Sequence, residues 1–288
     1  MCKRAEKILV HVIVITITYF YGVNAFGLDM MGPPSAGLKK GQIGAGADYS
    51  DTRMNIDFRN GIIIDDIYQF GALAGRTSTN IRSFTIHHLK MHKGYANIGY
   101  GLTDDLEMFI RVGGMNTEFS GNLFPSQTSA SEKYNGDTGF AIGFGTKVTF
   151  YKKDKLKLGG LFQMSRASSE ASLDADSLPG EIKLNIVEMQ IAVGPTYQLT
   201  DKIAIYGGPF WHFINFNGSK IKESRNPAID PSQAEQKISH ASYDIDNIAR
   251  FGVYIGAQFE FLKNTFYCIE YQHTADANAL AMSVRWKF

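Results

Sequence analysis

The chain closes with Ala281-Met282-Ser283-Val284-Arg285-Trp286-Lys287-Phe288, eight residues that alternate apolar and polar side chains without a break. Successive side chains of an extended strand point to opposite faces, so the apolar residues share one face that ends in Trp286 and Phe288. A frayed terminus would leave both rings in water. Two alternatives fit this stretch alone: an edge strand on a soluble core, and a strand that crosses a bilayer with its apolar face toward lipid.

A two-strand unit with a short polar turn recurs along the chain. In its first copy, residues 96–102 and 106–112 are joined by Thr103-Asp104-Asp105. Alternating runs joined by about two or three polar residues are typical of tight β-hairpins. Long polar stretches at 116–137, 166–181 and 217–246 separate the hairpins, and the pattern of short turns and long loops indicates a transmembrane barrel. The further copies are 140–151 with 156–163, 194–199 with 203–206, and 251–262 with 266–272.

The strand count supports a closed barrel. Residues 42–50 alternate and predict a first strand, the four hairpins add eight, and 279–288 returns last. This predicts an all-β, up-and-down antiparallel barrel of about ten strands, an even number with both ends on the periplasmic side. The count becomes eight or twelve if the first loop, within the poorly patterned segment 51–91, hides a hairpin or if the first strand at 42–50 is misread. In that segment we expect strand ends around a loop at 61–79, and we expect the last strand to pair with 43–49.

The first residues have the layout of a secretory signal peptide. Lys3, Arg4 and Lys7 precede an apolar run at 8–21, and Val23-Asn24-Ala25 offers the small residues of a cleavage site. The apolar run is shorter than the roughly 20 residues that a spanning helix needs. We therefore predict a signal peptide at 1–25, a periplasmic lead-in at 26–38 and one barrel domain at 39–288. Of the 2 cysteines, only Cys268 would remain, which excludes an intramolecular disulfide.

Composition fits a β-rich chain, and it argues against a nucleic-acid partner. The chain has 29 Gly, 14 Tyr and 20 Phe against only 8 Pro, and its net charge is +1. Alternation places almost every strand charge on the side opposite the apolar face, as a lipid-facing barrel requires, because a Lys or Arg facing lipid costs about 2–4 kcal/mol. The predicted lumen-facing charges are Asp48, Glu107, Arg111, Lys147, Lys157, Glu188, Glu260, Glu270, Arg285 and Lys287.

These five acids and five bases could pair across a narrow lumen and largely fill it. Glycines on the same face, including Gly44, Gly99 and Gly101, are open to two interpretations. They either ease strand curvature and packing, which we favour, or line a small passage.

With its signal peptide, its short turns at 102–106 and 199–203, and its C-terminal strand, the chain resembles Gram-negative outer-membrane β-barrel proteins. The alternating Val284, Trp286 and Phe288 are similar to the signal by which the barrel assembly machinery recognises its substrates. The resemblance implies periplasmic chaperones and that machinery as partners, and outer-membrane lipid and lipopolysaccharide as surroundings. It does not imply one activity, since barrels of this size include pores, adhesins, structural proteins and a few enzymes.

The sequence favours a narrow passive channel or a structural surface protein over an enzyme. The alternative is an omptin-like or lipid-modifying hydrolase with a site at the extracellular rim, for which Asp65, Asp66 and His212 are the candidates. The omptin pattern has an Asp two residues before that His, where this chain has Phe210. No spacing selects a Ser/His pair, a metal site or a nucleotide fingerprint, so we assign no catalytic residue, metal or cofactor.

Overall fold

The computed structural model describes residues 28–69, 72–121, 132–175, 178–226, 235–244 and 248–288. The predicted signal peptide lies outside these residues. The described part of the chain folds into one antiparallel sheet of twelve strands. The strands are β1 (Ile43–Gln69), β2 (Ala72–Gly101), β3 (Leu106–Gly121), β4 (Glu132–Asn135), β5 (Gly139–Lys153), β6 (Leu156–Ala175), β7 (Leu178–Thr200), β8 (Ile203–Asn226), β9 (Glu235–Asp244), β10 (Ile248–Leu262), β11 (Thr265–Thr274) and β12 (Ala277–Lys287).

Ten of these strands close into a barrel, which confirms the predicted fold class. The order runs β10, β11, β12, β1, β2, β3, β5, β6, β7, β8, and β8 then pairs with β10. β4 lies beside β3, while β9 pairs with β8 and β1 beyond the barrel. The last strand pairs with the first from Gly44 opposite Lys287 to Tyr49 opposite Met282, as predicted.

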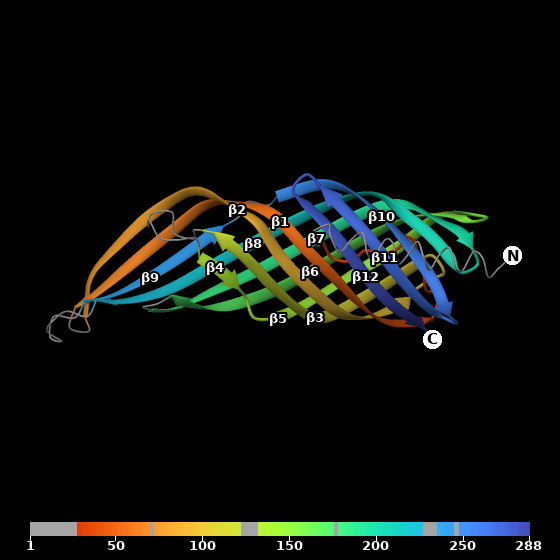
Figure 1. The fold of residues 1–288 in the computed structure, drawn as a ribbon. Helices are drawn as coiled ribbons and strands as arrows, with labels where there is room; N and C mark the ends of the chain where they lie inside the picture. The colour runs from red at the N-terminus through yellow and green to blue at the C-terminus, as the bar shows by residue number, and fades with distance from the viewer. Residues whose placement is uncertain (1–27, 70–71, 122–131, 176–177, 227–234, 245–247) are drawn as a thin grey trace.

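Four tight hairpins gather at one end of the barrel, together with the C-terminus (Figure 1). They join β2 to β3, β5 to β6, β7 to β8 and β10 to β11. Asp154 and Asn264 adopt positive φ angles of 49° and 61° in two of these turns. Asp and Asn tolerate this left-handed conformation better than other residues with a side chain, so the polar turns predicted from the sequence suit their geometry.

At the other end the strands continue where the sequence predicted loops. β1 and β2 run through 61–69 and 72–79, and most of 166–181 and 217–246 is also strand. The pairing of β1 with β2 has a register shift between Met54 and Ile56. Before the shift even-numbered residues such as Met54 are buried, and after it the odd-numbered Ile63 is buried. We call the sheet formed there by the far ends of β1, β2 and β6–β9 the extension; in Figure 1 it reaches well past β10, β11 and β12.

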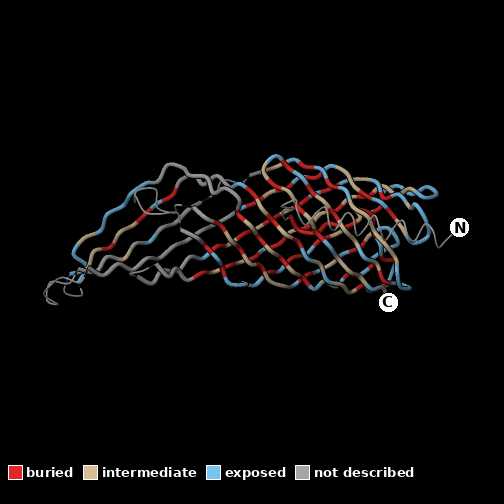
Figure 2. The backbone as a smooth tube through the Cα atoms, viewed as in Figure 1, coloured by how far each residue is buried: buried red, intermediate tan, exposed pale blue. Residues whose placement is uncertain are grey.

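The outside of the barrel is apolar. Buried and exposed positions alternate along its strands (Figure 2), and the exposed ones carry large apolar side chains up to the 65% exposure of Ile255. A continuous exposed apolar surface of this kind is what a lipid-facing barrel presents. Examples from five strands are Ile98, Ile110, Ile142, Phe144, Ile191, Val193, Val253 and Ile255.

Within the described residues, no helix has the length and apolarity to cross a membrane.

The segment before β1 lies inside the barrel, where the sequence predicted a periplasmic lead-in. Residues 28–38, which we call the lumen segment, form neither strand nor helix. Leu28, Asp29 and Leu38 are at most 1% exposed. The irregular backbone of this segment has no periodicity that a sequence pattern could detect, and this explains why its position was missed.

Candidate functional site in the barrel lumen

The lumen segment enters at the short-turn end and is held by backbone hydrogen bonds to wall carboxylates. At the entrance, the amide N–H of Gly41 donates to the carbonyl oxygen of Gly101 at 2.8 Å. Glu107 accepts from the amides of Gly37 and Leu38 at 2.9 and 3.1 Å. Further in, Glu270 accepts from the amides of Met31 and Gly32 at 3.1 and 2.8 Å. Carboxylates thus satisfy the donors of an irregular backbone that has no strand partner.

Asp29 is the centre of a buried ion network. Its carboxylate lies 2.5 Å from Nη2 of Arg111 and 3.2 Å from Nζ of Lys93, and Ser165 donates to it at 2.6 Å. Lys93 continues to Glu188 at 2.6 Å. All five residues are buried. Buried charges are tolerable only when they are paired and hydrogen-bonded, so each member depends on the others.

Glutamines on three strands support the same point of the segment. Gln272 donates to the backbone carbonyl of Asp29 at 2.9 Å, and Gln163 donates to it at 3.4 Å. Gln190 links these two, since it donates to Gln272 at 3.1 Å and accepts from Gln163. The wall therefore recognises both the side chain and the backbone of Asp29.

Inner-face glycines make room for the segment. A methyl group added at Gly101 would lie 2.0 Å from the carbonyl oxygen of Lys39, and one at Gly159 would lie 2.5 Å from Cα of Ser35. Methyl groups added at Gly44 and Gly99 would lie 3.1 and 3.2 Å from the side chain of Leu38, a looser contact. At these positions the glycines fit the wall to a second backbone inside it, which neither curvature nor an empty passage explains.

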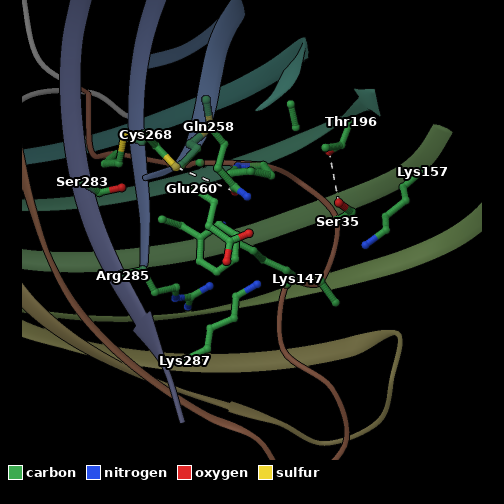
Figure 3. A pocket seen from close by; sticks show the side chains of 18 of the residues that line it. Ser35, Lys147, Lys157, Thr196, Gln258, Glu260, Cys268, Ser283, Arg285 and Lys287 are labelled. Atoms are coloured by element: carbon green, nitrogen blue, oxygen red, sulfur yellow. Dashed lines mark hydrogen bonds between the residues drawn. The ribbon is translucent and has the colours of Figure 1, made fainter. Parts of the chain in front are cut away.

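A cavity of about 480 Å³ lies beside the segment and reaches the short turns (Figure 3). The segment contributes Ser35, which donates to Oγ1 of Thr196 at 3.1 Å. The charged residues among the described lining are the bases Arg111, Lys147, Lys155, Lys157, Lys202, Arg285 and Lys287 and the acids Asp48, Asp154, Asp201 and Glu260. The cavity is therefore predominantly cationic.

The residues predicted to face the lumen fall into two groups. Seven of them line the cavity: Asp48, Arg111, Lys147, Lys157, Glu260, Arg285 and Lys287. The other three, Glu107, Glu188 and Glu270, are almost fully buried against the segment or its ion network. As far as the described residues show, two members of the predicted set form an ion pair with each other: Arg285 lies 2.5 Å from Glu107.

Sequence reasoning missed the two partners that complete the network, Asp29 and Lys93. Lys93 could have been predicted, because Lys93, Tyr95, Asn97 and Gly99 are spaced by two and therefore lie on the same inward face of β2. Asp29 had none, because its segment is irregular.

The residues considered for a rim hydrolase lie far apart. Ile238 of β9 pairs with Asp66 on one side and with Glu223 of β8 on the other. His212 lies eleven residues before Glu223 on β8, roughly 35 Å along the strand at about 3.3 Å per residue. His212 is buried beside Glu188, with 3.8 Å between Nε2 and Oε2.

Asp66 is occupied in the extension, where it accepts two hydrogen bonds from Arg76 at 2.6 and 3.0 Å. These bonds hold the pKa of Asp66 below its usual range. Among the described residues, no three His, Cys, Asp or Glu side chains gather as a metal site would require.

The residues of the predicted assembly signal lie at the short-turn end. Trp286 and Phe288 are exposed, and Val284 is half-buried. The amide of Phe288 donates to the carbonyl oxygen of Ile43 at 2.9 Å, so the last residue is fixed to the first strand.

No protein-family model matches the chain, and no curated protein matches its sequence. Its fold is similar to solved outer-membrane barrels. They include the outer membrane protease OmpT from Escherichia coli (12% identity, 85% of this chain and 97% of that chain, TM-score 0.43). Another is the translocator domain of the autotransporter NalP from Neisseria meningitidis (12%, 88% and 90%, TM-score 0.40). A third is the outer membrane protein OprG from Pseudomonas aeruginosa (10%, 88% and 98%, TM-score 0.40). At these identities the likeness concerns the fold alone. The chain itself is a closed antiparallel barrel of ten strands with an exposed apolar outer face.

Proposed function

We propose that the protein resides in the outer membrane of a Gram-negative bacterium and is a narrow channel that its own lumen segment keeps closed. The exposed apolar outer face supports this location. In this proposal the leader at 1–25 directs export, and periplasmic chaperones and the assembly machinery recognise Val284, Trp286 and Phe288. The short turns then face the periplasm and the extension faces outward among lipopolysaccharide.

The observation that carries the proposal is the way in which the lumen is filled. A purely structural barrel fills its interior with strand side chains, whereas this wall has glycines where the lumen segment passes. The segment is held by hydrogen bonds and ion pairs, without strand pairing, so it can leave without opening the barrel. Its departure would open the path that it occupies.

A structural surface protein is the second candidate, and the extension favours it. Six strands continue beyond the barrel there, with β9 joining β8 to β1. A rim hydrolase receives less support, because Asp66 and His212 are separated along the sheet.

Planar-bilayer recording tests the channel. We expect few conductance steps from the full-length protein, and frequent steps from a variant that lacks residues 28–38. A third variant, Ser35→Cys with Thr196→Cys in a Cys268→Ser background, would tie the segment to the wall, since the native oxygens are 3.1 Å apart. It should stay silent when oxidised and behave as the parent when reduced.

Silence from the deletion variant, in preparations whose gel mobility still changes on boiling as folded barrels do, would contradict the channel. The structural candidate would then remain.

A further inference from the structure

The strongest unexplained feature is the group of lysines in the cavity. Lys147 of β5, Lys157 of β6 and Lys287 of β12 reach the same space from three strands (Figure 3). Among the described residues, none of the three has a carboxylate within the 4.0 Å of an ion pair. Their ring contacts are Lys147 with Phe109 at 5.9 Å and Lys287 with Phe266 at 3.8 Å, measured to the ring centroid.

Of the three lysines, Lys147 is the one that most needs a counter-charge, because it is only 7% exposed. A buried ammonium group without a counter-charge is costly. Glu107 and Glu270 attract it at longer range. However, Glu107 already accepts from Arg285 and the lumen segment, and Glu270 already accepts from the segment and Gln272. The acids nearest to Lys147 are therefore engaged elsewhere.

We propose that this cavity binds a small soluble oxyanion with two or more negative charges, carried on phosphate or carboxylate groups. Several ammonium groups around one space favour a multivalent anion, and lysine binds such oxygens as a point charge. The volume of about 480 Å³ admits a small molecule. The cavity lies inside the barrel, away from the lipid-facing surface, so its ligand comes from solution at the short-turn end.

This proposal goes beyond the channel and does not depend on it, because the site is complete with the lumen segment in place. The segment itself supplies part of the wall, with Met31, Gly32 and Ser35 lining the cavity. A protein that never conducts could still bind the anion.

Calorimetric titration of the full-length protein in neutral detergent tests the proposal, with pyrophosphate and citrate as separate probes at constant ionic strength. We expect saturable binding of at least one probe at one site per chain. The variants Lys147→Met and Lys287→Met should each weaken binding at least tenfold. Lys263→Met is the matched control, because Lys263 is an exposed lysine in the turn between β10 and β11 that does not line the cavity.

Two results would overturn the proposal: no saturable binding of either probe, or equal losses in Lys147→Met and Lys263→Met. Boiling-dependent gel mobility verifies the barrel in each variant. If Lys147→Met does not fold, Lys287→Met at the more accessible edge of the cavity decides the question.

Discussion

Asp29→Asn should release the lumen segment. The substitution keeps the side-chain size but removes the only charge that the segment places between Arg111 and Lys93 in the described structure. Breaking a buried pair by removing one partner costs about 3–5 kcal/mol. At about 1.36 kcal/mol for each factor of ten, the undocked fraction of the segment should rise at least a hundredfold.

Cysteine labelling measures that fraction. Leu28 is fully buried and does not line the cavity, so a Leu28→Cys side chain in a Cys268→Ser background reacts with a soluble maleimide only after the segment leaves. Fast reclosing makes the labelling rate follow the open population. We expect a rate at least a hundredfold higher with Asp29→Asn.

The matched control is Asp276→Asn, because Asp276 also pairs with an arginine, Arg250 at 2.5 Å, but both side chains are more than a third exposed. That variant should label at the parent rate. If Asp29→Asn also labels within about twofold of the parent, the ion network does not hold the segment and our reasoning fails.

Three further outcomes are expected. Gly101→Val should displace the segment and speed Leu28→Cys labelling, because the new side chain would meet Lys39, whereas Gly75→Val on the same strand has open space and should not. Deleting Phe288 should lower the yield of heat-modifiable barrel in the outer membrane, and Leu73→Ala, an exposed apolar residue of the extension, should leave that yield unchanged. Arg76→Ala should leave the temperature of thermal unfolding of the barrel unchanged, because the Arg76 side chain is largely exposed and solvent screens its pairing with Asp66.

The barrel itself was predictable because a lipid-facing wall imposes a period of two. Each spanning strand needs apolar residues on one side and tolerates polar ones on the other, so the strand number, the short turns and the β1–β12 closure were all readable. The extension follows no such rule. Its strands at 61–69 and 72–79 pair with each other through hydrogen bonds. Ile62, Ile63 and Ile64 stand side by side in the sequence, so apolar and polar residues do not alternate there and the segment was mistaken for a loop.

The sequence could predict only those residues of the site that lie on strands. Alternation pointed inward for Glu107, Arg111 and Glu270, and the structure buries all three. Nothing in the sequence indicated that Glu107 and Glu270 would bind the backbone of an irregular segment. Long-range packing of this kind leaves no local pattern, since its partners are separated by 70 and 238 positions.

The five acids and five bases predicted to face the lumen therefore do not mainly neutralise one another by pairing across it. Two of the acids, Glu107 and Glu270, hold the lumen segment, and the lysines are left facing the cavity. If the segment withdrew, both carboxylates would lose those amide donors and would be free to attract the lysines. The cavity would become less cationic, so a multivalent anion should bind the closed barrel more tightly than the open one. Linkage then requires the anion to stabilise the closed state.

Labelling of Leu28→Cys in the Cys268→Ser background tests this coupling, because Leu28 is buried but does not line the cavity and a bound anion does not cover it. Saturating pyrophosphate, or citrate where that is the probe that binds, should slow labelling by the ratio of its affinities for the closed and open states. Adding Lys147→Met should abolish the effect. An anion that binds without changing the labelling rate would show that the cavity and the segment act independently.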